Sequence, residues 1–246
     1  MTTAQAVTRP RWSAEHLFFG AMSLAALAAV CLGFGRSFLL RPFFPDLRVP
    51  PEPFFRLHGV VFLSWFVLLT VQTTLVAQRR VAIHRSLGVF GGVLATVMVV
   101  MGLTGAVLAA RRPGGFIGIP LPPLQFLVVP VFDMVTFAAL IGTGLGLRRN
   151  PQAHKRLMLI GSIAILIPAV ARWPGVIQAG GPLAVFGITD LFLAPLVAWD
   201  LTTRRRLHPA TLWGGLGLVL SELLRLVLSQ THGWLTFARW LTGLAG

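Results

Sequence analysis

The sequence predicts an all-α protein, an integral membrane bundle of seven transmembrane helices that forms a single domain over residues 1–246. Composition is the first observation behind this prediction, since 55% of the residues are hydrophobic, only 11% are charged and the mean hydropathy is +0.79. A soluble domain carries roughly 25% charged residues, and so little polar surface does not cover a chain of this size in water. The composition therefore excludes a soluble enzyme and a disordered tail.

Seven apolar runs are the second observation, and each is about 20 residues long, the length that crosses a hydrocarbon core of about 30 Å. The runs are too long for the strands of a membrane barrel and lack the alternation of such strands. The first run is predicted to be an uncleaved helix for two reasons. The residue directly before Cys31 is Val30 and not a small residue, and the apolar run continues past the cysteine. The runs cover residues 15–38, 54–77, 87–110, 123–147, 156–172, 183–201 and 210–230.

The connections between the runs are the third observation, and they predict the orientation. Of the 21 Lys and Arg residues, twelve fall on the side that holds the N-terminus, eight fall on the other side, and Arg225 lies inside a helix. The positive-inside rule makes the first side cytoplasmic, so the net charge of +14 serves topology and predicts no nucleic-acid partner. The twelve are Arg9, Arg11, Arg79, Arg80, Arg85, Arg148, Arg149, Lys155, Arg156, Arg204, Arg205 and Arg206; the eight are Arg36, Arg41, Arg48, Arg56, Arg111, Arg112, Arg172 and Arg239.

Ionisable residues within membrane helices are costly and mark candidate functional sites. Placed by the helical rise of 1.5 Å per residue, six of them, from five runs, lie at or beyond the midplane on the side opposite the N-terminus. We expect them to converge on a shared polar cavity in the outer half of the bilayer. The six are His58, Asp133, Arg172, Asp190, Glu222 and Arg225.

Prolines support this cavity, because Pro130, Pro168 and Pro195 interrupt three of the runs and free backbone carbonyls there. Broken helices beside buried carboxylates form the binding sites of several transporters, although a tolerated kink is an equally common role of such prolines.

Three roles are open for the six residues. Histidine and carboxylates can bind a metal such as Mn, Fe or Zn, and the same groups can relay protons. The third role is mutual neutralisation that only holds helices in register. In that case Glu222 would pair with Arg225, three residues away, and Asp133 or Asp190 with Arg172 or Arg56.

Two further histidines form a second candidate site on the cytoplasmic side. His84 and His154 each follow a pair of arginines, near the start of the third and fifth helices and at the same depth. Two neutral imidazoles that face each other can hold a haem as axial ligands. The alternative is a pair of exposed histidines at the water boundary.

Several short motifs carry a resemblance to known proteins. They are Leu57-His58-Gly59, Gln72, His84-Arg85-Ser86-Leu87-Gly88, His154-Lys155-Arg156-Leu157-Met158 and Arg172. With them the chain resembles a family of uncharacterised bacterial multi-pass membrane proteins. That pattern is itself loosely similar to cytochromes of the b561 type, in which histidines on four successive helices bind two haems. The likeness spans the second to fifth helices, about half of the chain.

The resemblance implies a bacterial cytoplasmic (inner) membrane protein that transfers electrons and binds haem b through His84 and His154. The sequence departs from the b561 pattern at one position, and this departure limits what the resemblance implies. The fourth helix carries Asp133 where the b561 pattern has a histidine, which leaves His58 without a partner. The resemblance thus implies one haem at most, and no electron path across the membrane through paired haems.

Three functions are compatible with these observations. The first is a membrane redox protein resembling a b-type cytochrome, the second a transporter or a protein that binds a small ligand, metal or proton in the outer cavity. The third is a non-catalytic subunit that packs on a membrane partner or on itself through Gly88/Gly92 and Gly142/Gly146, since small residues four apart let helices approach closely. No catalytic residue is identified, and whether the protein is an enzyme stays open.

The C-terminal segment 231–246 has two predicted arrangements. Trp234, Ala238 and Leu241 share one face of a helix there, so the segment either lies in the outer membrane interface or extends the seventh helix.

Overall fold

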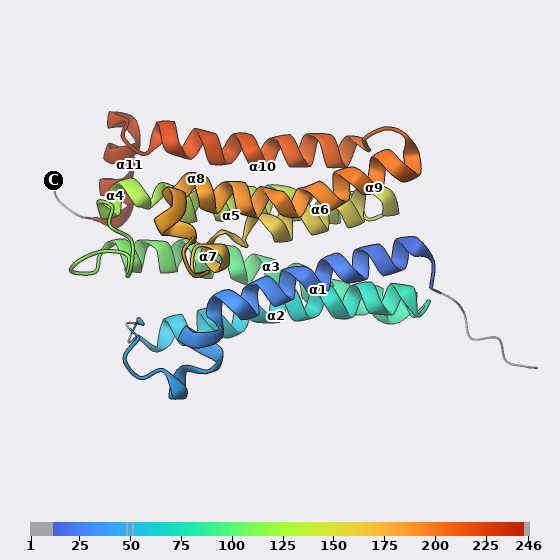
Figure 1. Cartoon of the computed structure of the whole chain (residues 1–246), viewed down its shortest axis with the longest axis horizontal. Coiled ribbons are helices and arrows are strands. Elements are labelled where there is room, and N and C mark those ends of the chain that lie inside the picture. The colour runs from blue at the N-terminus through green and yellow to red at the C-terminus, as the bar shows by residue number, and fades with distance from the viewer. Residues whose placement is uncertain (1–11, 48, 51, 244–246) are drawn as a thin grey trace, which may run out of the picture.

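The computed structural model describes residues 12–47, 49–50 and 52–243. Over these residues the chain contains helices and turns but no strand, which confirms the predicted all-α class. Seven helical spans in this part of the chain are long and apolar enough to cross a membrane, as predicted, and they indicate a polytopic membrane protein (Figure 1). They are Ala14–Leu39, Pro53–Ala77, Val81–Ala110, Pro123–Gly146, Pro151–Val170, Val176–Arg204 and Pro209–Leu228.

Several spans consist of more than one helical element. The elements are α1 (Ala14–Phe34), the π-helical turn η1 (Gly35–Leu39), the 3-10 turn η2 (Arg41–Phe43), α2 (Pro53–Ala77), α3 (Val81–Ala110), α4 (Pro123–Phe126), α5 (Val128–Gly146), α6 (Pro151–Ala164), α7 (Ile167–Val170), α8 (Val176–Asp190), the 3-10 turn η3 (Leu191–Leu193), α9 (Ala194–Arg204), α10 (Pro209–Leu228) and α11 (His232–Thr242).

The surface of the bundle is apolar along its length, and its interior holds charge. Leu32, Val89 and Val227 are each at least 70% exposed, whereas the side chains of Arg156 and Arg225 are fully buried. A soluble protein rarely exposes such contiguous apolar surface, and hydrocarbon removes this cost. The exposed surface is therefore of the kind that a membrane protein presents to lipid.

The three predicted proline interruptions occur, and each begins four residues before its proline. α4 ends at Phe126 before Pro130, α6 ends at Ala164 before Pro168, and α8 gives way to η3 at Leu191 before Pro195. Proline has no N–H to bond the carbonyl four residues earlier, and its ring crowds that carbonyl. The sixth span also bends at Gly180–Gly181, where Gly181 has a φ of 55°.

Two helices begin earlier than predicted. α3 starts at Val81 rather than residue 87, and α6 starts at Pro151 rather than residue 156. Asn150 caps α6 by accepting a hydrogen bond from the Ala153 N–H at 3.2 Å, and proline suits the first helical position. Asn-Pro is thus a helix start here and not only a turn, and it places Arg156 inside α6 instead of in the preceding connection.

The connections 78–80, 147–150 and 205–208 lie at one end of the bundle, beside the start of α1, and we call it the arginine end (Figure 1). The assignment of this end to the cytoplasm stays a prediction. Arg9, Arg11 and Arg48, which contribute to that prediction, lie outside the described residues.

α6 is the central helix of the bundle and packs against α5, α10 and α1. About 78% of the residues in the fifth span are buried, against 28–44% in the other spans. The helix presents small residues to its neighbours, as where Gly161 meets Ile141 of α5. This position brings polar side chains of α6 into the interior of the bundle.

Within the described part of the chain, the pairs Gly88/Gly92 and Gly142/Gly146 do not mark close approaches between helices. A Cβ at Gly142 or Gly146 would meet nothing within 4 Å, and one at Gly88 or Gly92 would meet only a side-chain tip. The close approach occurs instead at Gly33, where a Cβ would collide with the backbone of α7. Contact of these pairs with another protein stays a prediction.

The C-terminal segment forms a separate helix, α11, and does not extend α10. Thr231 caps it by accepting from the Trp234 N–H at 3.3 Å, and the Trp234 indole donates to the Leu124 carbonyl at 2.8 Å. Trp234, Ala238 and Thr242 are its buried face, with Leu241 at the edge, and they pack on α3 and on α4–α5. Its location in the membrane interface stays a prediction, and residues 244–246 lie outside the described part.

Candidate functional site

The six ionisable residues predicted for one cavity fall into two groups. Asp133 of α5, Asp190 of α8, and Glu222 and Arg225 of α10 lie together, and we call these four the carboxylate cluster. Within the described part of the chain, His58 and Arg172 make no hydrogen bond or ring contact with the cluster. The structure therefore does not join these two residues to the cluster by a direct contact, and their place in a shared cavity stays a prediction.

Arg225 is the only cation of the carboxylate cluster, and it pairs with Asp133. Its Nη1 donates to Asp133 Oδ1 at 2.5 Å, and both side chains are buried. Its Nη2 donates to Ser221 Oγ at 3.2 Å, and Ser221 also contacts the Thr136 hydroxyl at 3.2 Å. The expected pairing of Arg225 with Glu222 does not form, because α10 packs on α5 and turns the guanidinium toward Asp133.

Asp190 and Glu222 face each other across α8 and α10. Glu222 is 1% exposed, and neither of its carboxyl oxygens has a hydrogen-bond partner among the described residues. Asp190 Oδ1 and Arg225 Nε are also buried without a partner in this part of the chain. Buried polar atoms are nearly always hydrogen-bonded, so these four atoms mark the carboxylate cluster as a candidate binding site.

A cavity of roughly 270 Å³ adjoins the cluster at the end away from the arginine end. Arg225 is part of its wall, and Gln125, Ser229 and Gln230 supply its other polar groups. Pro182, next to the bend of α8, also lines the cavity. The cavity can therefore bring a small solute or water close to the Arg225 guanidinium.

His58 and Arg172 occupy aromatic surroundings. The His58 ring stacks on Phe62 with 4.0 Å between ring centroids. Arg172 donates from Nη1 to the Pro168 carbonyl at 2.6 Å and lies 4.5 Å above the Phe34 ring. Arg172 thus satisfies a backbone carbonyl near the break between α6 and α7, and neither residue pairs with Asp133 or Asp190.

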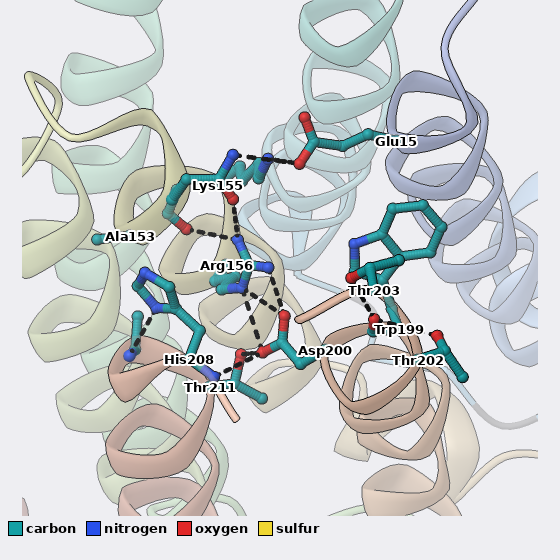
Figure 2. A network of polar contacts seen from close by, with 12 residues as sticks. Glu15, Ala153, Lys155, Arg156, Trp199, Asp200, Thr202, Thr203, His208 and Thr211 are labelled. Carbon is teal, nitrogen blue, oxygen red and sulfur yellow. Dashed lines mark hydrogen bonds and ion pairs between the residues drawn. The ribbon is translucent and has the colours of Figure 1, made fainter. Parts of the chain in front are cut away.

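A buried ion pair at the arginine end was missed by the sequence analysis. Figure 2 shows the guanidinium of Arg156 directed at the carboxylate of Asp200, and both residues are 0% exposed. Arg156 Nη1 also donates to the Gln152 side chain at 2.6 Å. Asp200 Oδ2 accepts from Thr211 Oγ1 at 2.5 Å and from the His208 N–H at 3.0 Å.

This network joins α6, α9 and α10, and nearly every buried polar atom in it has a partner. A fully satisfied network of this kind is structural by its geometry. Two signals in the sequence could have revealed it: Asn150-Pro151 as a helix start, and Asp200 as an acidic residue near the end of an apolar run. Lys155 and Glu15 form a more exposed ion pair beside it and tie α1 to α6 (Figure 2).

His208 caps α10 next to this network, and its protonation should weaken the fold. Its Nδ1 accepts from the Ala210 N–H at 3.0 Å. Burial, together with the charges of Arg156 and Arg204, lowers the pKa of His208 below the ordinary 6.5. The unfolded chain therefore binds this proton first, so the stability contributed by the neutral ring is present above pH 6.5 and is lost as the pH falls below it.

We expect the unfolding midpoint of the detergent-purified protein to fall as the pH drops below this value. His208→Asn retains a capping oxygen that does not titrate, so the variant should lose less stability over the same pH interval. Thermal unfolding of both proteins, followed by circular dichroism, measures the difference. Identical pH dependence in the two proteins would contradict this role of His208.

The structure brings His84 and His154 together, as the sequence predicted. His84 lies in the first turn of α3 and His154 in the first turn of α6. Their ring centroids are 6.5 Å apart, with an angle of 80° between the ring planes. His154 Nδ1 is 2.8 Å from the Gly144 carbonyl oxygen, whereas His84 Nδ1 is buried and has no partner among the described residues.

Comparisons of the chain with protein-family models, with curated proteins and with solved structures found no match. Within the described residues, no group of three or more His, Cys, Asp and Glu side chains is arranged to hold a metal ion. The two candidate functional sites of the chain are the His84–His154 pair and the carboxylate cluster.

Proposed function

We propose that the protein is a membrane electron-transfer protein that holds one b-type haem between His84 and His154. The single observation that carries this proposal is the approach of the two imidazoles, from different helices, at the same end of the bundle. A haem bound there supplies one-electron transfer, and the residues of this chain hold and orient it.

The separation of the rings supports two ligands for one group. With metal–nitrogen bonds of about 2 Å, two imidazoles whose ring centroids are 6.5 Å apart would both be able to reach one iron. His84 and His154 are therefore the residues that would hold the haem.

The hydrogen bond of His154 to the backbone also suits a ligand. When its Nδ1–H donates to the Gly144 carbonyl, Nε2 keeps the lone pair that coordinates iron, and the ring orientation is held. The exposed arginines of the nearby connections, among them Arg80 and Arg148, place positive charge where the carboxylates of a haem would need it.

A visible spectrum of the full-length protein, purified from a haem-replete host, tests the proposal. We expect a Soret band typical of haem with two histidine ligands, lost from His84→Ala and from His154→Ala and retained in His232→Ala, an exposed control. Loss follows because one ligand remains in each variant and cannot hold the group alone. A colourless wild-type protein, or a band unchanged in both ligand variants, would overturn the assignment.

The cavity beside Arg225 supports a second candidate function, binding or transport of a small ligand or of protons in the other half of the bundle. The unpartnered oxygens of Glu222 favour this candidate, because a structural ion pair has no need of them. The two functions use different residues and can occur in one protein.

A further inference from the structure

Asp190 and Glu222 present carboxyl oxygens to each other, and none of the described residues donates a hydrogen bond to either carboxyl group. Both oxygens of Glu222 and Oδ1 of Asp190 are buried without a partner there. An ionised carboxylate only accepts hydrogen bonds, so two ionised groups cannot satisfy each other. A protonated carboxyl donates, and one proton between the pair would satisfy two of these oxygens at once.

The net charge of the carboxylate cluster also favours a proton on the Asp190–Glu222 pair. Three carboxyl groups face one guanidinium, and that guanidinium already pairs with Asp133 at 2.5 Å. If every group were ionised, two negative charges would lie in the interior without a counter-charge, which is strongly unfavourable in a medium of low dielectric constant. One proton on the Asp190–Glu222 pair halves that excess, and Arg225, three residues from Glu222, lies close enough to stabilise the remainder.

The neighbouring elements that the structure describes bring no further cation. α7 and η3 contain no charged residue, and the cations of α6, Lys155 and Arg156, lie at the arginine end with Glu15 and Asp200 as partners. A metal cation would need several oxygen ligands, and the described residues contain no suitable group of three or more. A proton needs only the two oxygens that face each other.

We propose that Asp190 and Glu222 share one exchangeable proton and form a proton-binding site in the interior of the bundle. This inference does not depend on the haem. Asp190 is only partly buried and is the last residue of α8, just before the break at η3, whereas Glu222 is 1% exposed. Asp190 is therefore the group through which the proton reaches Glu222 from the surroundings.

Infrared spectroscopy of the purified full-length protein tests this site directly. A protonated carboxyl in an apolar interior gives a carbonyl stretching band that moves when H₂O is replaced by D₂O. We expect this band in the wild type at neutral pH, and we expect Glu222→Gln and Asp190→Asn each to abolish it. Asp46→Asn, which changes an exposed carboxyl of the connection between α1 and α2, should leave it intact.

The same measurement in a His84→Ala background removes any contribution from the carboxyl groups of a haem, so the outcome is independent of the first proposal. Circular dichroism confirms that each variant is folded. Loss of the band in both cluster variants supports the shared proton. A wild type without the band, or a band that survives Glu222→Gln, overturns the site, and loss in Glu222→Gln alone overturns the sharing with Asp190.

Discussion

Replacing Asp200 with asparagine should lower the free energy of unfolding by about 3–5 kcal/mol, the cost of leaving one partner of a buried ion pair without the other. Arg156 is 0% exposed and its guanidinium donates twice to the Asp200 carboxylate, so its charge has no alternative partner at that depth. The asparagine side chain keeps one oxygen for Thr211 and for the His208 N–H, and its amide nitrogen replaces the oxygen that faces Arg156, so the loss combines the missing charge with the missing hydrogen bonds to the guanidinium. Unfolding in mixed micelles of the purified protein gives the difference.

A double variant tests whether the uncompensated charge of Arg156 causes the loss of stability in Asp200→Asn. Arg156→Met combined with Asp200→Asn removes both charges and retains the acceptor, so it should recover most of the lost stability, since a buried pair is often no better than an apolar replacement. Arg149→Met, on an exposed connection, should change stability by about 0.5 kcal/mol or less. If the double variant is as unstable as Asp200→Asn, the uncompensated charge of Arg156 is not the cause.

Replacing Arg225 with methionine should have the second large effect, again about 3–5 kcal/mol at neutral pH. The substitution leaves three carboxyl groups in the cluster without a cation, and Asp133 loses its partner at 2.5 Å. The loss should shrink as the pH is lowered, because protonation removes the uncompensated charge of Asp133. Unfolding of wild type and Arg225→Met over a series of pH values measures both effects.

Asp133→Asn is the matched comparison for this prediction. Arg225 keeps its charge in that variant, and Glu222, on the same face of α10, is free to become its partner. The variant should therefore be more stable than Arg225→Met at neutral pH. A larger loss in Asp133→Asn than in Arg225→Met would contradict the view that the cluster carries an excess of negative charge.

The helical spans and their interruptions could be predicted from the sequence with little error. Hydropathy averages over about 20 neighbouring residues, and a proline acts on the carbonyl four residues before it, so both are local properties of the chain. The errors arose where two local signals compete. Arg156 was predicted as the first residue of its run and counted with the basic residues of that side, although Asn150 and Pro151 start the helix five residues earlier.

The candidate sites could be predicted only in part. His84 and His154 share a depth because each lies in the first turn of a helix that starts at the same end, and this follows from the sequence. The six residues of the opposite half were predicted from their depth along the helices, but depth carries no information on the direction in which a side chain points. In the structure His58 lies beside Gly105 of α3, whereas Asp133 faces Arg225 of α10.

The sequence by itself determined which segments are helices, where prolines break them, and how few acidic residues lie among the apolar spans. Only the tertiary structure decided the partners, joining Arg225 to Asp133, 92 positions away, and Arg156 to Asp200, 44 positions away. The apolar length of a span depends only on residues that are neighbours in the sequence. An ion pair depends on two helices that pack with both side chains facing each other at the same depth. The same packing leaves Asp190 and Glu222 facing each other without a cation.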